Sequence, residues 1–355
     1  MPKQIGNYIG FSTGTDGTSG AMDGIFNFFD QNRLADTDDW PGTTVAATGG
    51  TKLTPGNGFT YHVFESSGSL QIDSGDVTGA QVLIIGGGGS GAGGQGGGGA
   101  GGGIVHGPSI DLTPGTYPVT VGSGGAAVPD NVQYSSEGSN GSPSSFNSVT
   151  ALGGGGGLRN NYGWPSYGNS VPSPLSPNVA NTGGGGGGSG PGQPARPASP
   201  QPVPGDYTAY GGFTGAPQGT VGGASGGGGA GAGENAGPNS RPSGTPSPGG
   251  DGVAFPAFPA TIIGPAVPSF HRTNFNADVG PTGLYGGGGG GGDDSDGGNG
   301  GAGPGGGGAG GDPNSQNRVG AFMTGGGGGA TGSNANPHPY APRTAGGQGM
   351  VIVRY

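Results

Sequence analysis

The sequence contains no cysteine, few charged residues and no long apolar run. Without cysteine, disulfides cannot stabilise the chain and thiol redox chemistry is excluded. No stretch reaches the roughly 20 apolar residues that a transmembrane helix needs, so we expect none. The start, Met1-Pro2-Lys3-Gln4, lacks the apolar core of a signal peptide. We therefore expect synthesis in a cytoplasm and delivery to any outside location by assembly or lysis rather than by secretion.

Positive charge is also scarce. The chain has 10 Lys and Arg against 20 Asp and Glu, a net charge of −10, and only 8% of its residues are charged. Nucleic-acid binding needs clustered cations to neutralise phosphates, so we expect no nucleic-acid partner. Ordinary disorder goes with high net charge and few aromatics, whereas 13 Phe, 11 Tyr and 2 Trp are available here to build small cores.

Glycine is what the chain has in excess, with 99 of 355 residues, many in unbroken runs such as Gly86–Gly89 and Gly286–Gly292. Because no Gly-X-Y period is present, collagen is excluded. A bare run has no side chain to bury and loses much backbone entropy on ordering. It is therefore either a flexible linker or part of a stack of polyglycine II helices, whose outward N–H and C=O groups pair with neighbouring runs. The choice between linker and stack decides what the protein is.

Two parts of the chain are typical of β-structure. Residues 44–157 contain alternating or continuous apolar segments separated by turn residues. The predicted elements are a hairpin of Tyr61–Phe64 with Ser69–Ile72, a strand Ala80–Ile85 covered on both faces, two strands about Pro114-Gly115 within 110–121, and a strand at 145–152. The last residues, 349–355, are also strongly β-prone and need a sheet to join. Residues 346–355 are therefore expected to complete the domain that begins at residue 44.

The predicted fold is all-β with stacked polyglycine II helices and little α-helix. A small β-sandwich-like domain, 44–157 plus 346–355, is expected to carry a glycine-rich bundle with long irregular loops at 158–345. Structureless loops of such length are rare inside compact domains, which favours an ordered stack over a linker.

Residues 1–43 form a separate segment that holds almost all of the helix-compatible sequence. Its apolar side chains lie within a short amphipathic stretch that ends near Trp40-Pro41. They are either a self-packed cap or a segment for attachment and oligomerisation, because so small an apolar unit rarely makes a stable core alone. The candidate attachment residues are Ile25, Phe26, Phe28, Phe29 and Trp40.

The inserts between glycine runs are rich in proline and aromatics and poor in charge. Tyr, Trp and Asn make good recognition surfaces, because aromatic rings offer contact area at low entropic cost. The plainer interpretation is that these aromatics cover the flanks of the glycine stack, and we expect most Phe to do so. The candidate binding residues are Tyr162, Trp164, Tyr167, Tyr207, Tyr210, His271, Tyr285, His338 and Tyr340.

No motif predicts catalysis. The formal G-x-G-x-x-G at Gly86–Gly91 follows a strand, but the glycines after it cannot form the helix that a dinucleotide site needs. The four histidines are scattered without metal-ligand or triad spacing. We therefore expect no enzyme and no cofactor. The carboxylates of Asp293, Asp294 and Asp296 are a weak candidate for Ca²⁺, although a solvated loop is the simpler interpretation because the terminal Glu of an EF-hand is missing.

Several segments resemble the glycine-rich domain of bacteriophage tail-fibre and other virion proteins. They are FTYHVFESSGSLQI, VTGAQVLIIGGGGSGAGG, LTPGTYPVTVGSGG, SSFNSVTALGGGGG and GGQGMVIVRY. The amino-terminal GIFNFFDQNRLADTDDWP looks like the segment that precedes such domains. Glycine runs alternating with variable loops are similar to the tip adhesins of T-even-like long tail fibres, where stacked polyglycine II helices display receptor-binding loops. This chain departs from those adhesins in its amino terminus and in its final β-strand.

The resemblance implies a non-enzymatic adhesin on the outer surface of a virion, made in the host cytoplasm. The amino-terminal segment would bind other tail proteins, the loops would bind a bacterial polysaccharide or outer-membrane protein, and a homotrimer is one expected assembly. The alternative is a structural virion component, such as a head fibre, decoration or tail protein, without a receptor role. Ice binding by a flat glycine face is a more distant alternative, which thermal hysteresis would reveal.

Overall fold

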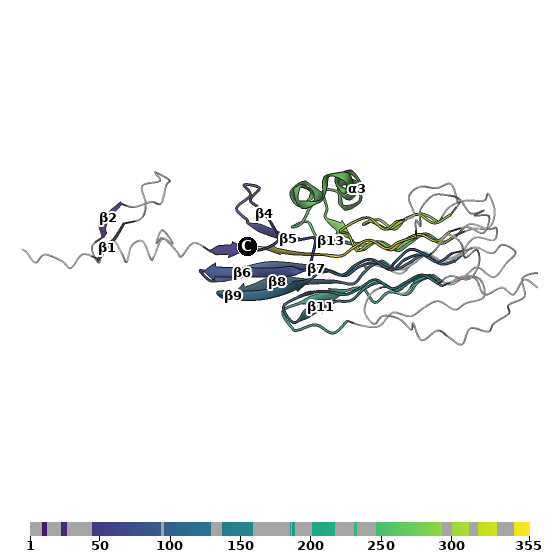
Figure 1. The fold of residues 1–355 in the computed structure, drawn as a ribbon, viewed down its shortest axis with the longest axis horizontal. Coiled ribbons are helices and arrows are strands. Elements are labelled where there is room, and N and C mark those ends of the chain that lie inside the picture. Colours follow the sequence, from purple (N-terminus) through teal and green to yellow (C-terminus); the bar gives the residue numbers. More distant parts are fainter. Residues whose placement is uncertain are drawn as a thin grey trace, which may run out of the picture.

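The computed structural model describes residues 45–93, 96–128, 137–158, 185, 187–188, 201–216, 231–232, 246–292, 300–311, 319–331 and 344–355, and the backbone of 9–12 and 23–26. Two antiparallel sheets form the body of the fold (Figure 1). The five-stranded sheet has the order β11 (Val149–Ala151), β10 (Ser144–Phe146), β9 (Gly115–Thr120), β6 (Gly68–Ser74), β3 (Ala46–Thr48). The six-stranded sheet has the order β12 (Thr208–Tyr210), β8 (Ile104–Leu112), β7 (Val77–Ile85), β15 (Met350–Arg354), β5 (Tyr61–Phe64), β4 (Thr51–Leu53).

The two sheets pack face to face through one apolar core. Leu70, Ile72 and Phe146 of the five-stranded sheet contact the same buried cluster as Val82 and Ile84 of β7. Because successive side chains of a strand point to opposite faces, the alternate residues Leu83 and Ile85 lie in a second cluster on the outer face. The prediction that Ala80–Ile85 is a central strand covered on both faces is confirmed.

The carboxyl-terminal strand β15 lies in the middle of the six-stranded sheet, between β7 and β5. Ile352 is opposite Leu83 on one side and Val63 on the other. Met350, Val351, Ile352 and Val353 are all fully buried. The prediction that this strand joins the sheet formed by residues near 80 is confirmed.

Two predicted strand connections are different in the structure. β5 and β6 do not form the predicted hairpin, because β5 pairs with β15 and β4 whereas β6 pairs with β9 and β3 in the other sheet. β8 and β9 likewise lie on either side of the Pro114-Gly115 turn but belong to different sheets. Each short connection crosses from one sheet to the other, so that Phe64 and Leu70 both face the core between them. Local turn chemistry is compatible with either outcome, and core burial decides between them.

The strand predicted at 145–152 is two strands. β10 and β11 pair with each other, Phe146 opposite Val149. The turn between them begins at Asn147, whose φ of 52° is one that Asn tolerates better than most residues.

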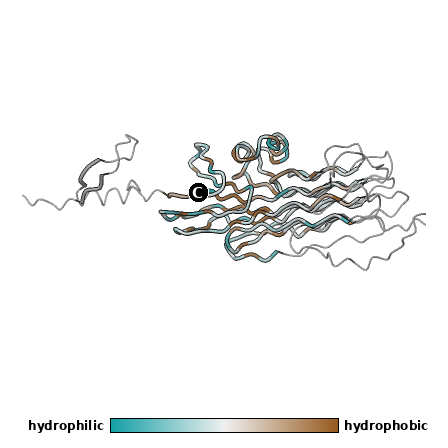
Figure 2. Tube along the Cα trace, viewed as in Figure 1, coloured by the Kyte–Doolittle hydropathy of each residue, from teal (hydrophilic) through white to brown (hydrophobic). Residues whose placement is uncertain are grey.

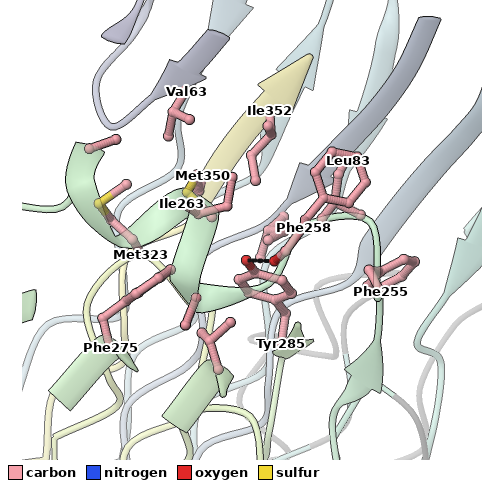
Figure 3. Close-up of a cluster of buried hydrophobic side chains, with 14 of the residues drawn as sticks. Val63, Leu83, Phe255, Phe258, Ile263, Phe275, Tyr285, Met323, Met350 and Ile352 are labelled. Atoms are coloured by element: carbon pink, nitrogen blue, oxygen red, sulfur yellow. Dashed lines mark hydrogen bonds between the residues drawn. The ribbon is translucent and has the colours of Figure 1, made fainter. Parts of the chain in front are cut away.

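The helices lie outside the amino-terminal segment where we expected helix-compatible sequence. They are α2 (Ala260–Ile263), the 3₁₀ helix η1 (Gly264–Ala266) and α3 (Ser269–Val279), flanked by the paired strands β13 (Val253–Ala254) and β14 (Leu284–Tyr285). Within 1–43, the described residues are β1 (Ile9–Ser12) and β2 (Asp23–Phe26), which pair with each other. The helical segment is stabilised by burying Phe258, Ile263 and Phe275 against the outer face of the six-stranded sheet (Figure 3), a tertiary contribution that outweighs local propensity.

The prediction of an all-β chain with little α-helix is confirmed by these elements. Apolar residues concentrate in the strands and the helical segment, whereas the glycine runs that extend from them are near neutral in hydropathy (Figure 2). The strands therefore hold the apolar cores, and the glycine runs must be held by other forces. The division of the chain at residues 43, 157 and 345 stays a prediction.

Candidate functional site

The glycine run Gly86–Ala92 continues directly from β7 and lies inside an array of other runs. Its amides donate in turn to three neighbours, with a period of three residues. The amides of Gly86, Gly89 and Ala92 donate to carbonyl oxygens in residues 97–103. The amides of Gly87 and Ser90 donate to carbonyl oxygens in residues 139–142, and those of Gly88 and Gly91 to carbonyl oxygens in residues 344–347. The N···O distances are 2.8–3.0 Å. Three residues is also the repeat of polyproline II-type helices, which have no internal hydrogen bonds.

The carbonyl groups of the same run point at three further neighbours. Those of Gly87 and Ser90 accept from the amides of 154 and 157, those of Gly89 and Ala92 from 328 and 331, and that of Gly88 from Gly125. The run therefore has six hydrogen-bonded neighbours, drawn from segments before and after residue 158. This satisfies the backbone polar groups that burial would otherwise leave unpaired.

Contact between the runs is so close that only glycine fits at most positions. A Cβ atom placed on Gly88 would overlap the carbonyl oxygen of Gly326, and one on Gly89 that of Gly155. Ser90 is fully buried within the array, and its hydroxyl oxygen accepts a hydrogen bond of 2.8 Å from the amide of Ser139. For the described runs, the linker alternative is wrong: they form an ordered array.

The runs end together in a layer remote from the sheets, which we call the distal layer (Figure 1). Its residues are joined by backbone hydrogen bonds and by the Val128 amide, which donates to the Thr344 hydroxyl. They are Gly91, Ala92, Gly96, Gly97, Val128, Leu158, Gly188, Gly292, Gly311, Ala330, Thr331 and Thr344.

Most of the long inserts adjoin this layer. Segments 129–136, 293–299, 312–318 and 332–343 each begin directly after a residue of the distal layer, and 332–343 also ends directly before one, Thr344. Segments 159–184 and 189–200 begin after Leu158 and Gly188. Inserts far apart in sequence are thus anchored at one end of the array.

A protein-family model for the glycine-rich domain matches residues 65–355. The chain belongs to the glycine-rich domain family. The match begins at the crossing between β5 and β6 and runs to the end of β15, so it includes most of both sheets and the array of runs. No curated protein matches the chain. Among the described residues of this glycine-rich domain protein, no helix is long and apolar enough to cross a membrane.

Several predicted binding residues belong to inserts at the distal layer. Tyr162, Trp164 and Tyr167 are in segment 159–184, and His338 and Tyr340 are in segment 332–343. All five lie outside the described residues, so their role stays a prediction. The same holds for the Ca²⁺ candidates in segment 293–299, Asp293, Asp294 and Asp296. Within the described part of the chain, no three His, Asp or Glu side chains are grouped closely enough to hold a metal ion.

Tyr285 was predicted to be an exposed binding residue, and this prediction is wrong. Its side chain is fully buried in the core under the helical segment (Figure 3). Its hydroxyl donates a hydrogen bond of 2.8 Å to the carbonyl oxygen of Phe258. Burial raises the pKa of the hydroxyl far above its usual value, so Tyr285 is a neutral core residue.

Tyr207 and Tyr210 lie on or beside the edge strand β12 and are half-buried. The Tyr210 ring meets the Phe255 ring edge-on, with centroids 5.3 Å apart. Tyr207 packs against the core between the sheets, and burial, with a smaller effect of Asp206, raises its pKa. Both side chains stabilise the sheet edge and leave only part of each ring for any contact with a partner.

His271 is the predicted binding residue with the most unusual surroundings. It lies on α3 between two phenylalanines, with ring centroids 4.0 Å from Phe270 and 4.2 Å from Phe322. Phe270 is 79% exposed, although we expected most Phe to be covered. Partial burial lowers the pKa of His271. From the sequence, only the adjacent aromatic residues Phe270 and His271 indicate this exposed aromatic group. Phe322 could not be assigned to it, because it comes from a turn far away in sequence.

The predicted attachment residues are described only in part. The backbone of Ile25 and Phe26 lies in β2, opposite Gly10 and Ile9 of β1. Phe28, Phe29 and Trp40 lie outside the described residues. The attachment role of this segment stays a prediction.

Proposed function

We propose that this protein is a bacteriophage virion component of the tail fibre or tail tip, a non-enzymatic adhesin that binds a receptor on the host surface. The observation that carries the proposal is the distal layer, where six inserts begin next to one another at one end of a glycine scaffold. A binding protein needs variable segments on a rigid support, since pre-ordering reduces the entropy lost on binding.

We infer that the runs of the array are polyglycine II helices. The support is their three-residue hydrogen-bond period and the six neighbours of the run Gly86–Ala92. In that conformation a run of this length extends roughly 20 Å, at about 3.1 Å per residue. The array would then hold the distal layer well away from the two sheets, in keeping with the extended glycine runs in Figure 1.

The chemistry of the inserts favours a receptor that is a polysaccharide or an outer-membrane protein. Segment 159–184 combines Tyr162, Trp164 and Tyr167 with several Asn and Ser residues and only one charge, that of Arg159. Aromatic rings with short polar side chains are the usual means of recognising uncharged and weakly charged surfaces. We propose that this segment and 332–343 make the contact, that residues 1–43 attach the protein to other tail proteins, and that it acts on the outside of the virion.

The test is inhibition of phage adsorption by the purified full-length protein. The wild-type protein is expected to block adsorption to the native host, and replacing Tyr162, Trp164 and Tyr167 together by Ala is expected to abolish the block. Phe270→Ala is the matched control, because Phe270 is also an exposed aromatic residue (79%) but lies on α3, beside the sheets. Equal inhibition by all three proteins, or none by the wild type, would contradict the proposal.

A structural virion component without a receptor role is the second candidate. The observation that favours it is that Tyr285, Tyr207 and Tyr210, three of the four predicted binding residues that the structure describes, pack against the protein's own cores. Labelling the protein on intact particles separates the two functions. A few copies at the tail extremity support adhesion, whereas many copies over the head or neck support a structural role.

A further inference from the structure

A polar group lies on the outer face of the six-stranded sheet, beside the helical segment. Arg354 of β15 is directly opposite Gln81 of β7 and Tyr61 of β5. His106 of β8 is opposite Leu83 of β7. Leu83 lies two residues after Gln81 and on the same face of the sheet. Gln81 is therefore a direct cross-strand neighbour of Arg354, whereas His106 lies on the far side of β7, and the Phe258 ring is near both His106 and Arg354. We call Gln81, His106 and Arg354 the Arg354 cluster.

The guanidinium of Arg354 donates hydrogen bonds through one of its nitrogens and packs against two aromatic rings. Its Nη1 donates to the Ala257 carbonyl oxygen at 3.2 Å and to the Tyr61 hydroxyl at 3.4 Å. The Phe59 ring centroid lies 4.1 Å from Cζ and the Phe258 centroid 5.7 Å away. These contacts fix the plane of the guanidinium but leave the edge formed by Nε and Nη2 unused.

Each member of the Arg354 cluster has a buried polar atom without a partner among the described residues. The atoms are Arg354 Nε, Gln81 Oε1 and His106 Nε2. Buried polar atoms are nearly always hydrogen-bonded, and an unpaired one costs about 1–3 kcal/mol. Three such atoms on three adjacent strands of one sheet face are therefore a specific feature that needs an explanation.

In the described part of the chain, no negatively charged group offsets the charge of Arg354, whose partners there are a carbonyl oxygen, a hydroxyl and two aromatic rings. His106 does not supply negative charge. Its pKa is lowered, mainly by burial and to a smaller extent by the positive charge of Arg354. A neutral imidazole can donate or accept through Nε2. The cluster thus offers one cation, one amide acceptor and one neutral imidazole.

We propose that the Arg354 cluster binds a small carboxylate that carries a neighbouring hydroxyl group. The carboxylate accepts two hydrogen bonds from the Nε and Nη2 edge of Arg354, the side-by-side geometry that a guanidinium offers to carboxylates. The hydroxyl donates to Gln81 Oε1, and His106 Nε2 bonds to a second hydroxyl. Both a free hydroxy acid and a uronic acid residue of a polysaccharide have this chemistry. The proposal does not depend on the adhesin function.

Phe59 is placed to cover this site. It lies in the connection between β4 and β5, where Gly56 and Gly58 have φ of 82° and 84° and nothing lies within 4 Å of an added Cβ. The connection therefore has space to move, and Phe59 itself is 41% exposed. Its ring lies over one face of the guanidinium, 4.1 Å from Cζ, so it would shield from water an ion pair formed at the neighbouring edge.

The test is titration of the ¹⁵N-labelled full-length protein, following the Nε–H signal of Arg354 by NMR. Sodium glucuronate is expected to shift this signal saturably, and glucose, which lacks the carboxylate, is expected to leave it unchanged. Sodium lactate separates the two ligand sources: lactate binding as tight as that of glucuronate indicates a free hydroxy acid, whereas tighter glucuronate binding indicates the sugar. No saturable shift with either carboxylate overturns the proposal, and separate ordered waters would then be the partners of the three atoms.

Two variants and a control make the result specific, with glucuronate affinity measured by calorimetry. Arg354→Lys keeps the charge but loses the bidentate edge, so affinity is expected to fall at least about 10-fold. Phe59→Ala, at an exposed position, is expected to weaken binding several-fold without unfolding the protein. Arg272→Lys is the control, because the Arg272 guanidinium already donates to the carbonyl oxygens of Val267 and Pro265. Unchanged affinity in both test variants, or an equal loss in the control, overturns the assignment.

Discussion

The carbonyl oxygen of Gly326 occupies the space into which a side chain on Gly88 would project. The two residues belong to runs that are more than two hundred positions apart in sequence and adjacent in the array. The amide of Gly88 meanwhile donates to the carbonyl oxygen of Gly347 at 2.9 Å. Gly88 is therefore fixed from two sides by backbone atoms, which cannot move aside as the end of a flexible side chain can.

Gly88→Ala is expected to destabilise the protein by about 3 kcal/mol or more, because overpacking against backbone must separate neighbouring runs. Gly301→Ala is the matched control within the array, since its added Cβ would meet nothing closer than the Pro248 Cβ at 3.6 Å. The control is expected to stay within about 0.5 kcal/mol of wild type. Urea unfolding of both variants measures the difference, and equal stability of the two would show that the runs are not closely packed.

The position of β15 at the centre of a sheet leads to a second prediction. Ile352 is fully buried between Leu83 and Val63 in the core under the helical segment. Ile352→Ala should therefore lower the free energy of unfolding by about 2–5 kcal/mol through lost burial and a new cavity. Val319→Ala, at a residue that is 46% exposed, should change it little. Thermal unfolding of the two variants is the measurement, and a small effect at Ile352 would mean that β15 is dispensable.

The strands were predictable from sequence where local pattern and burial agree. Ala80–Ile85 is apolar throughout because both of its faces are covered, and the β-prone end of the chain could only be stable inside a sheet. The crossing between β5 and β6 was not predictable, because a short turn-forming segment serves a hairpin and a sheet-to-sheet connection equally well. The order of the glycine runs depends on which distant runs they meet, and their sequences are almost identical.

The candidate site was less predictable than the fold. Tyr285 and His271 are both aromatic residues within the same insert, yet one is a core residue and the other lies in an exposed aromatic group. The difference arises from the helical segment, which turns Tyr285 toward Phe258 and leaves Phe270 in solvent. Composition shows that an insert has binding chemistry, but only tertiary packing decides which rings remain available.

The burial of Tyr285 predicts that Tyr285→Phe will separate stability from binding. Removing the hydroxyl leaves the Phe258 carbonyl oxygen without this donor, which is expected to cost about 1–2 kcal/mol. Inhibition of phage adsorption is expected to stay at the wild-type level, because the ring has no access to a receptor. Chemical unfolding and the adsorption assay, performed on the same preparation, provide both readouts. Lost inhibition with unchanged stability would reverse the assignment of Tyr285 to the core.

We expect His62 to make the stability of the protein dependent on pH. It is fully buried, and its Nδ1–H donates to the Gly49 carbonyl oxygen at 2.7 Å while Nε2 accepts from the Tyr355 hydroxyl at 3.2 Å. Burial, and secondarily the charge of Lys52, lowers the pKa of His62 below its ordinary value of 6.5, although the Gly49 bond acts in the opposite direction. The unfolded chain therefore binds a proton at a pH where the folded protein does not.

By linkage, this difference lowers the free energy of unfolding as pH falls below about 6.5, and the loss continues until the folded-state pKa is reached. Above about pH 7.5 neither state binds the proton, so His62 adds no slope there. The measurement is urea unfolding between pH 8 and 5 for wild type and His62→Gln. The variant is expected to lose part of the slope, with the rest due to His106 and His271, whose pKa values are also lowered by burial. His271→Gln, at a partly exposed helix position, is the matched control and should keep most of the slope, whereas a flat wild-type profile would show that His62 is protonated equally in both states.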